Sequence, residues 1–123
     1  MIVTVTPNPS TDRTVSLSSA LTRGAVHRVS SVSSEPGGKG VNVARALTLA
    51  GVDAIAVLPA AAADPFLTLV AGADVPAAPV AVRGTVRTNL TITEPDGTTT
   101  KLNEPGARLD GAAGTLPVDS AID

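Results

Sequence analysis

Apolar and polar positions alternate over short stretches in the first half of the chain and then give way to one longer helical pattern. Residues 2–6 form a β-branched run that ends at a Pro-Asn-Pro turn, which predicts a short strand. Residues 25–32 alternate like a second, partly exposed strand, whereas residues 40–50 are rich in helix formers and stop at Gly51. Residues 54–58 resemble a buried strand. This order of elements predicts a β-α-β unit with parallel strands.

The second half of the chain predicts a β-hairpin. Residues 86–93 and 98–102 are rich in Thr, Val, Leu and Ile, and they flank a Glu-Pro-Asp-Gly turn. Alternation along the first of these strands puts Arg87 and Asn89 on the same face. Two weaker patterns predict a short helix at residues 64–72 and a strand at residues 80–82. Residues 111–123 show no periodicity, which predicts weak order.

The composition excludes several classes of function. The apolar fraction is 43%, Phe66 is the single aromatic residue, and the net charge is -2. Nucleic-acid binding is therefore not expected, because the chain has a single aromatic side chain on which a base could stack and no net positive charge to attract phosphates. The chain has no cysteine, so disulfides and cysteine-based sites are excluded. It shows neither a signal-like start nor an apolar run of roughly 18 residues, so we expect a soluble, cytoplasmic protein without membrane contact.

A glycine-rich segment directly precedes the predicted helix of residues 40–50. Gly37, Gly38 and Lys39 lie where the first backbone N–H groups of a helix have no intrahelical partners, which is the chemistry of an anion site. The segment lacks the spacing of a Walker A loop and of a dinucleotide fingerprint. A glycine-rich helix start can also be only a tight turn. The adjacent Lys39 and Asn42 favour binding.

Other candidate residues are isolated in the sequence. Asp12 follows the Pro-Asn-Pro turn in a predicted loop, where it could accept hydrogen bonds from sugar hydroxyls or simply act as a loop or capping residue. Arg87 and Asn89 could form a solvated strand face, although Arg is well suited to phosphate recognition. The sole histidine, His27, has no triad or metal-ligand neighbours in the sequence, and no paired carboxylates occur. We therefore expect no metal site.

Three separated blocks together resemble one protein family. Residues 3–13, residues 36–47, and residues 87–90 with 103–106 are similar, in this order and spacing, to the N-terminal half of the PfkB branch of ribokinase-like sugar kinases. The similarity is strongest to members that phosphorylate fructose 1-phosphate. It implies an α/β fold, the N-terminal part of a ribokinase-like α/β/α sandwich, with a small β lid drawn from residues of about 14–34 and 86–103.

The resemblance also implies a reaction and a site. Family members transfer the γ-phosphoryl group of ATP, with Mg2+, to a sugar or sugar phosphate, and their lids often pair between subunits, so a homodimer through the lid is expected. By resemblance, Asp12 would hold sugar hydroxyls, Gly37 and Gly38 would bring backbone close to the sugar, and Lys39 and Arg87 would neutralise phosphate. The expected substrate-binding residues are Asp12, Gly37, Gly38, Lys39, Asn42, Arg87, Asn89 and Asn103.

The chain also departs from the family pattern. The family's catalytic base is the aspartate of a Gly-Ala-Gly-Asp segment, and no such segment occurs in these 123 residues. Residues 60–63 are four alanines where relatives commonly show a glycine pair, and residues 109–123 match poorly. We therefore expect an N-terminal portion without catalytic residues or an ATP site of its own, and inactive alone. A tagatose-6-phosphate or fructose-6-phosphate kinase fragment and a non-catalytic sugar-phosphate-binding or oligomerising remnant remain as alternatives.

Overall fold

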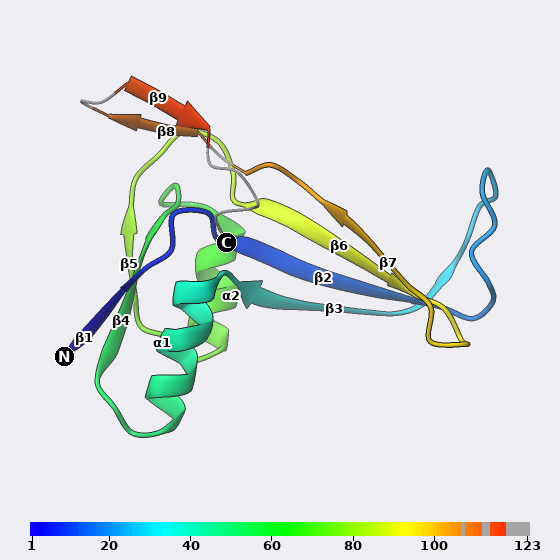
Figure 1. Cartoon of the computed structure of the whole chain (residues 1–123), viewed down its shortest axis with the longest axis horizontal. Helices are drawn as coiled ribbons and strands as arrows, with labels where there is room; N and C mark the ends of the chain where they lie inside the picture. The colour runs from blue at the N-terminus through cyan, green and yellow to red at the C-terminus, as the bar shows by residue number, and fades with distance from the viewer. Residues whose placement is uncertain (107, 112–113, 118–123) are drawn as a thin grey trace.

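The computed structural model describes residues 1–106, 108–111 and 114–117. Within these residues the chain forms two helices and three sheets (Figure 1). In chain order the elements are β1 (Ile2–Val5), β2 (Ser10–Leu17), β3 (Val29–Gly37), α1 (Lys39–Leu49), β4 (Ala54–Pro59), α2 (Pro65–Gly72), β5 (Ala77–Val80), β6 (Arg87–Thr93), β7 (Thr99–Asn103), β8 (Arg108–Gly111) and β9 (Gly114–Pro117).

The body sheet has the strand order β1-β4-β5, and all its strands are parallel, as the β-α-β pattern predicted. Helices α1 and α2 cover one of its faces (Figure 1). Alternate residues of β4 point into that interface, where Ala56 and Leu58 are at most 1% exposed and pack with Phe66 of α2. Burying a side chain of the size of Leu or Phe contributes about 1.5–3 kcal/mol to folding. These contacts fix the helices, and with them the start of α1.

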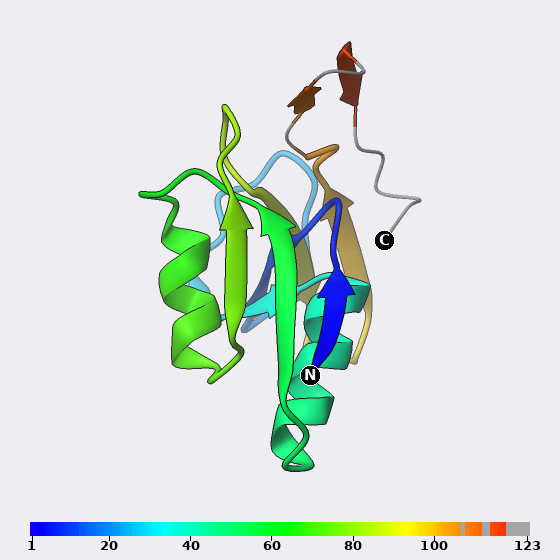
Figure 2. The same ribbon diagram turned by 90° about the vertical axis from the view of Figure 1, so that its left-hand side faces the viewer.

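The opposite face of the body sheet carries apolar residues that the described helices do not cover. Val3 and Val5 of β1 pair with Ile55 and Val57 of β4 and are 56% and 65% exposed. Val80 at the end of β5 is 56% exposed. Figure 2 looks onto this face of the sheet. The described residues therefore form a sheet with one helix layer.

The long sheet has the strand order β3-β2-β6-β7 and extends away from the body (Figure 1). Strand β2 pairs antiparallel with β3 and parallel with β6, and β6 pairs antiparallel with β7. Because side chains alternate along a strand, one face of this sheet is polar and carries Ser10, Asp12, Arg87 and Asn89. Three predicted site residues, Asp12, Arg87 and Asn89, therefore lie on one face of this sheet.

Several predicted elements are confirmed. Helix α1 spans residues 39–49, and Gly51 follows it with a φ of 79°. Helix α2 begins after Asp64, whose carboxylate accepts a 2.9 Å hydrogen bond from the Phe66 N–H and caps the helix. The predicted hairpin forms between β6 and β7, with the Glu94 N–H donating to the Thr98 carbonyl at 2.9 Å. No helix in the described part of the chain is long and apolar enough to cross a bilayer.

Other predictions were wrong in position. The predicted loop around Asp12 is strand β2, because a ladder with β3 on one side and β6 on the other stabilises a polar segment that lacks the apolar alternation of a core strand. The strand expected at residues 25–32 instead covers Val29–Gly37, since residues 22–25 form a turn closed by a 3.1 Å hydrogen bond. Pro36 is tolerated there because β3 is an edge strand.

Two further differences concern the second half of the chain. The strand expected at residues 80–82 lies at Ala77–Val80 and includes Pro79, which is acceptable at the edge of the body sheet. The weak order expected for residues 111–123 falls largely outside the described residues. Within the described part, β8 and β9 pair antiparallel, which the sequence pattern did not predict.

Candidate functional site

A row of polar residues crosses the long sheet in register. Asp12 on β2 pairs with Glu35 on β3 and with Asn89 on β6, and Asn89 pairs with Asn103 on β7. We call these four residues the polar row. Residues that pair in register share a face, so the row is one line of carboxylate and amide groups. Three of the predicted site residues, distant in sequence, are thereby brought side by side.

Asp12 is held by its neighbour on the same face of β2. The Ser10 hydroxyl donates a 2.7 Å hydrogen bond to Asp12 Oδ1. Ser10 is 2% exposed, whereas the Asp12 side chain is exposed. A hydrogen bond to an ionised acceptor is stronger than a neutral one, so this contact restricts the rotamer of Asp12. One carboxylate oxygen is thus engaged while the group as a whole stays open to solvent.

Gly37 lies against the Asp12 carboxylate. A Cβ added to Gly37 would overlap Asp12 Oδ2 and lie 2.7 Å from Ser10 Oγ. Any larger residue would therefore displace the Asp12 side chain or the β3 backbone. The prediction for Gly37 was a close approach to a sugar, and in the structure its close neighbour is the Asp12 carboxylate.

The start of α1 follows immediately. Gly38 is the N-cap, with a φ of 117°, and a Cβ there would lie 2.5 Å from the Thr6 methyl carbon. No acidic residue occupies the first turn, so the partial positive charge of the helix N-terminus is not offset there. Lys39 and Asn42 are both exposed and, three residues apart, lie on the same side of the helix. This end of the helix combines free N–H groups with an ammonium group and an amide.

Arg87 is not the solvated strand residue that one interpretation of the sequence allowed. Its side chain is 5% exposed. Its guanidinium donates a 3.2 Å hydrogen bond to the Asn8 carbonyl and a 3.4 Å hydrogen bond to the Glu104 carbonyl. Ser10 of β2 pairs with both Arg87 and Gly37. Arg87 therefore lies on the same face as the polar row, two residues before Asn89 on β6. Its charge is held in place beside the row and is largely shielded from bulk solvent.

Asn89 contributes an acceptor in the middle of the polar row. Among the residues that the structure describes, its side-chain oxygen is buried and accepts no hydrogen bond. Leaving such an acceptor without a partner costs about 1–3 kcal/mol, and a ligand hydroxyl could recover this only after the Asn89 side chain shifts, because its oxygen is not exposed. Asn103, at the end of the row, is exposed. The row therefore offers acceptors and donors to a hydroxyl-bearing ligand.

The sequence did not reveal three residues that shape this region. Ser10 orients Asp12, Asn8 is 2% exposed and contacts Arg87, and Thr6 is fully buried against the glycines at the start of α1. Ser10 could have been found from its spacing of two residues from Asp12 if β2 had been predicted as a strand. Asn8 and Thr6 carry no sequence signal beyond their place in the turn.

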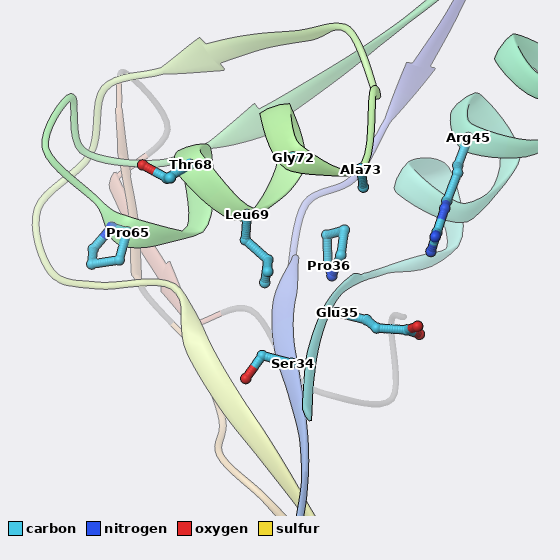
Figure 3. A pocket seen from close by; sticks show the side chains of 9 residues that line it. All are labelled: Ser34, Glu35, Pro36, Arg45, Pro65, Thr68, Leu69, Gly72 and Ala73. Carbon is cyan, nitrogen blue, oxygen red and sulfur yellow. The ribbon is translucent and has the colours of Figure 1, made fainter. Parts of the chain in front are cut away.

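A pocket borders the polar row, and Glu35 of that row is one of its lining residues. It has a volume of about 620 Å³ and is formed where β3 meets α1 and α2 (Figure 3). Figure 3 shows Glu35 and Arg45 on one side of it, with Pro36 and Leu69 among the other lining residues. None of the eight predicted site residues lines this pocket. The predicted site residues lie across the long sheet and the start of α1, and two of them line smaller pockets, Asn103 one of about 410 Å³ and Arg87 one of about 270 Å³.

No group of three or more His, Cys, Asp or Glu side chains comes together within the described residues. The polar row has only two carboxylates, Glu35 and Asp12, and a 2.7 Å hydrogen bond from Ser10 engages one oxygen of Asp12. These residues suit hydroxyl binding better than the oxygen cage that Mg2+ requires.

Known proteins are similar to this chain in fold and in sequence. The family model described as pfkB family carbohydrate kinase matches residues 6–119. A 1-phosphofructokinase of Xanthomonas campestris is 42% identical over 113 residues, covering 89% of this chain and 35% of that protein. Phosphofructokinase-2 of Escherichia coli, solved in complex with fructose-6-phosphate, matches with a TM-score of 0.78 and 33% identity over 89% of this chain and 37% of that one. A putative phosphofructokinase of Staphylococcus aureus matches with a TM-score of 0.79 and 26% identity, over 93% of this chain and 37% of that one.

These likenesses establish the class of the protein: its fold is that of a ribokinase-like carbohydrate kinase. The chain belongs to the pfkB family of carbohydrate kinases. It spans about a third of the length of these relatives, 35% of the Xanthomonas protein and 37% of the Escherichia coli protein.

Proposed function

We propose that this chain supplies the acceptor side of an ATP-dependent sugar-phosphate kinase, with fructose 1-phosphate as acceptor and fructose 1,6-bisphosphate as product. The observation that carries this proposal is the convergence of Asp12, Gly37 and Asn89 next to the N-terminus of α1. The 1-phosphofructokinase of Xanthomonas campestris, at 42% identity, favours fructose 1-phosphate as the acceptor. Fructose 6-phosphate and tagatose 6-phosphate are the competing acceptors.

Each part of the site has a physical role in this proposal. Asp12 and Asn89 accept hydrogen bonds from sugar hydroxyls, while Asn42 and Asn103 donate amide hydrogen bonds. Gly37 and Gly38 allow the sugar to lie close to the backbone. Lys39 and Arg87 provide positive charge for the phosphate already present on the sugar. Together these groups position the acceptor hydroxyl, which is most of what phosphoryl transfer asks of a protein.

The phosphoryl donor is ATP with Mg2+, which supplies the γ-phosphoryl group and neutralises charge on the phosphates. We propose that the catalytic base and the residues that hold this donor are not among these 123 residues, because the sequence has no Gly-Ala-Gly-Asp segment. The chain on its own is then a sugar-phosphate-binding unit with little or no kinase activity. It acts in the cytoplasm. A coupled ADP-release assay should detect no turnover by the chain alone, and turnover would contradict this part of the proposal.

A specific observation also favours self-association through the long sheet, which would act as a lid. The face opposite the polar row carries Leu90, Ile92 and the exposed residues Val32 and Leu102, which are 45% and 57% exposed. A second copy could cover these apolar side chains. Sedimentation measurements should show a dimer in which Leu102→Glu gives monomers. A monomeric chain would contradict this proposal without affecting the acceptor site.

Calorimetric titration tests the acceptor site. Fructose 1-phosphate should bind the chain saturably and more tightly than fructose 6-phosphate or tagatose 6-phosphate. Asp12→Asn should weaken binding at least about tenfold, because a hydrogen bond to a charged group contributes about 1.5–3 kcal/mol. Asp53→Asn is the matched control, since Asp53 is exposed and directly precedes β4, outside the proposed site. Equal binding by the Asp12 and Asp53 variants would contradict the proposed role of Asp12.

A further inference from the structure

The turn between β1 and β2 is tied to the segment that follows β7. The Asn8 side-chain amide donates a 3.2 Å hydrogen bond to the Pro105 carbonyl, across a separation of 97 residues. Asn8 is 2% exposed. In the sequence it is the middle residue of the Pro-Asn-Pro turn. The contact therefore joins two loops at one end of the long sheet, where β2 and β7 are separated by β6 and do not pair directly.

Arg87 lies between these same two loops. One guanidinium nitrogen donates to the Asn8 carbonyl at 3.2 Å and another donates to the Glu104 carbonyl at 3.4 Å. Glu104 directly precedes Pro105, so the Asn8 side chain links the two backbone segments whose carbonyls bind Arg87. The hydrogen bond made by Asn8 therefore ties together the two segments that carry those carbonyls.

Two more contacts hold the second loop in place. The Thr88 N–H donates a 2.6 Å hydrogen bond to Glu104 Oε1. Gly106 has a φ of 100°, and a Cβ there would overlap the Asn8 side-chain oxygen. The approach of this loop to Asn8 is therefore close enough to exclude any side chain at residue 106.

We infer that Asn8 is a positioning residue for Arg87. A guanidinium that is 5% exposed must be hydrogen-bonded, because burying a charge without partners is costly. A long side chain also loses conformational freedom when it is fixed. The hydrogen bond from Asn8 to Pro105 keeps both carbonyl acceptors in place, so the positive charge of Arg87 stays beside the polar row. This inference rests on the proposed function in one respect, namely that Arg87 acts on the phosphate of the ligand.

The first test needs no ligand. NMR should show that the guanidinium N–H groups of Arg87 exchange with water at least about tenfold more slowly than those of exposed Arg13 in the unmodified chain. Asn8→Leu, which has a similar shape but no donor, should remove this difference. Thr93→Val is the matched control, because it deletes a 3.0 Å hydrogen bond to Ser16 at the far end of the same sheet. Equally fast exchange in the unmodified chain, or retained slow exchange in a folded Asn8→Leu variant, overturns the inference.

The smaller variant Asn8→Ser keeps the test decisive if Asn8→Leu does not fold. It also removes the donor from within reach of Pro105, and it should give the same loss of slow exchange at Arg87. Fast exchange at Arg87 in the unmodified chain overturns the inference whether or not either variant folds.

The second test separates positioning from general loss of structure. The affinity for fructose 1-phosphate relative to that for fructose measures the contribution of the phosphate. Asn8→Leu should reduce this ratio about tenfold and leave the affinity for fructose within about twofold, since only the phosphate faces Arg87. An equal loss for both ligands overturns the positioning role. If the unmodified chain binds neither ligand, the proposed function fails, while the exchange measurement still decides the role of Asn8.

Discussion

Ser10 Oγ donates a 2.7 Å hydrogen bond to Asp12 Oδ1, and the other oxygen of the same carboxylate lies against Gly37. The carboxylate is therefore oriented by a side chain from its own strand and by backbone from the neighbouring strand. An oriented carboxylate loses less conformational freedom when it binds a hydroxyl. This arrangement supports the proposed role of Asp12 as an acceptor of sugar hydroxyls.

Ser10→Ala should weaken the binding of fructose 1-phosphate by about tenfold or slightly more, because a hydrogen bond to a charged group is worth about 1.5–3 kcal/mol. Calorimetric titration measures the change. Ser30→Ala provides the control, since the Ser30 hydroxyl donates a 2.9 Å hydrogen bond to the Ser16 carbonyl in the outer part of the sheet. If the Ser10 variant binds as the Ser30 variant does, Ser10 does not orient Asp12 for the ligand.

Gly37→Ala should displace the Asp12 carboxylate and abolish binding, and it should lower the free energy of unfolding by about 1–3 kcal/mol because the new Cβ is overpacked. Gly72→Ala is the matched control, because a Cβ there meets no atom within 4 Å at the end of α2. The control should be neutral or more stable by up to about 1 kcal/mol. Denaturant unfolding and titration of both variants check the prediction, which fails if Gly37→Ala binds normally.

Lys39→Ala should weaken binding of the phosphorylated sugar and leave stability unchanged, because Lys39 is exposed and packs on nothing in the core. A single partly screened charge is worth about 1 kcal/mol, so we expect a loss of about fivefold at low salt that shrinks as salt is added. Arg83→Ala removes an exposed positive charge outside the site and serves as the control. A loss that does not depend on salt would show that Lys39 does not act through its charge.

Asp96 provides a pH prediction for the β6–β7 turn. A hydrogen bond from the Thr98 N–H, at 2.8 Å, lowers the pKa of Asp96 below the ordinary value of 3.8. Since the folded pKa is the lower one, the stabilising contribution is present above the unfolded pKa and disappears as the pH falls through the folded pKa. An NMR titration should place the midpoint of Asp96 below 3.8, and Asp96→Asn should remove the acid-dependent change in the turn. A midpoint at or above 3.8 would contradict this assignment.

Much of the body could be predicted because its signals are local. The α1 helix stops before a glycine with positive φ, Asp64 caps α2, and the Glu-Pro-Asp-Gly turn closes the hairpin. Strand β2 could not be predicted in this way. Its residues are mostly polar, and pairing with two neighbouring strands stabilises it.

The site shows the same division between local and distant information. One local stretch of sequence was enough to predict that Gly37, Gly38 and Lys39 lie at the start of a helix, and α1 begins at Lys39. The burial of Arg87 could not, because the carbonyls that bind it come from a turn 79 residues earlier and a loop 17 residues later. Asn8 was missed for the same reason, since its side-chain partner, Pro105, is 97 residues away.

An NMR titration of the isotope-labelled chain with fructose 1-phosphate tests the central claim most directly. The account predicts saturable shifts of the backbone amides of Asp12, Gly38, Lys39 and Asn89, which lie on β2, on β6 and at the start of α1. Shifts confined to Arg45 and Leu69 of the pocket in Figure 3, or no saturable shifts at all, would contradict it.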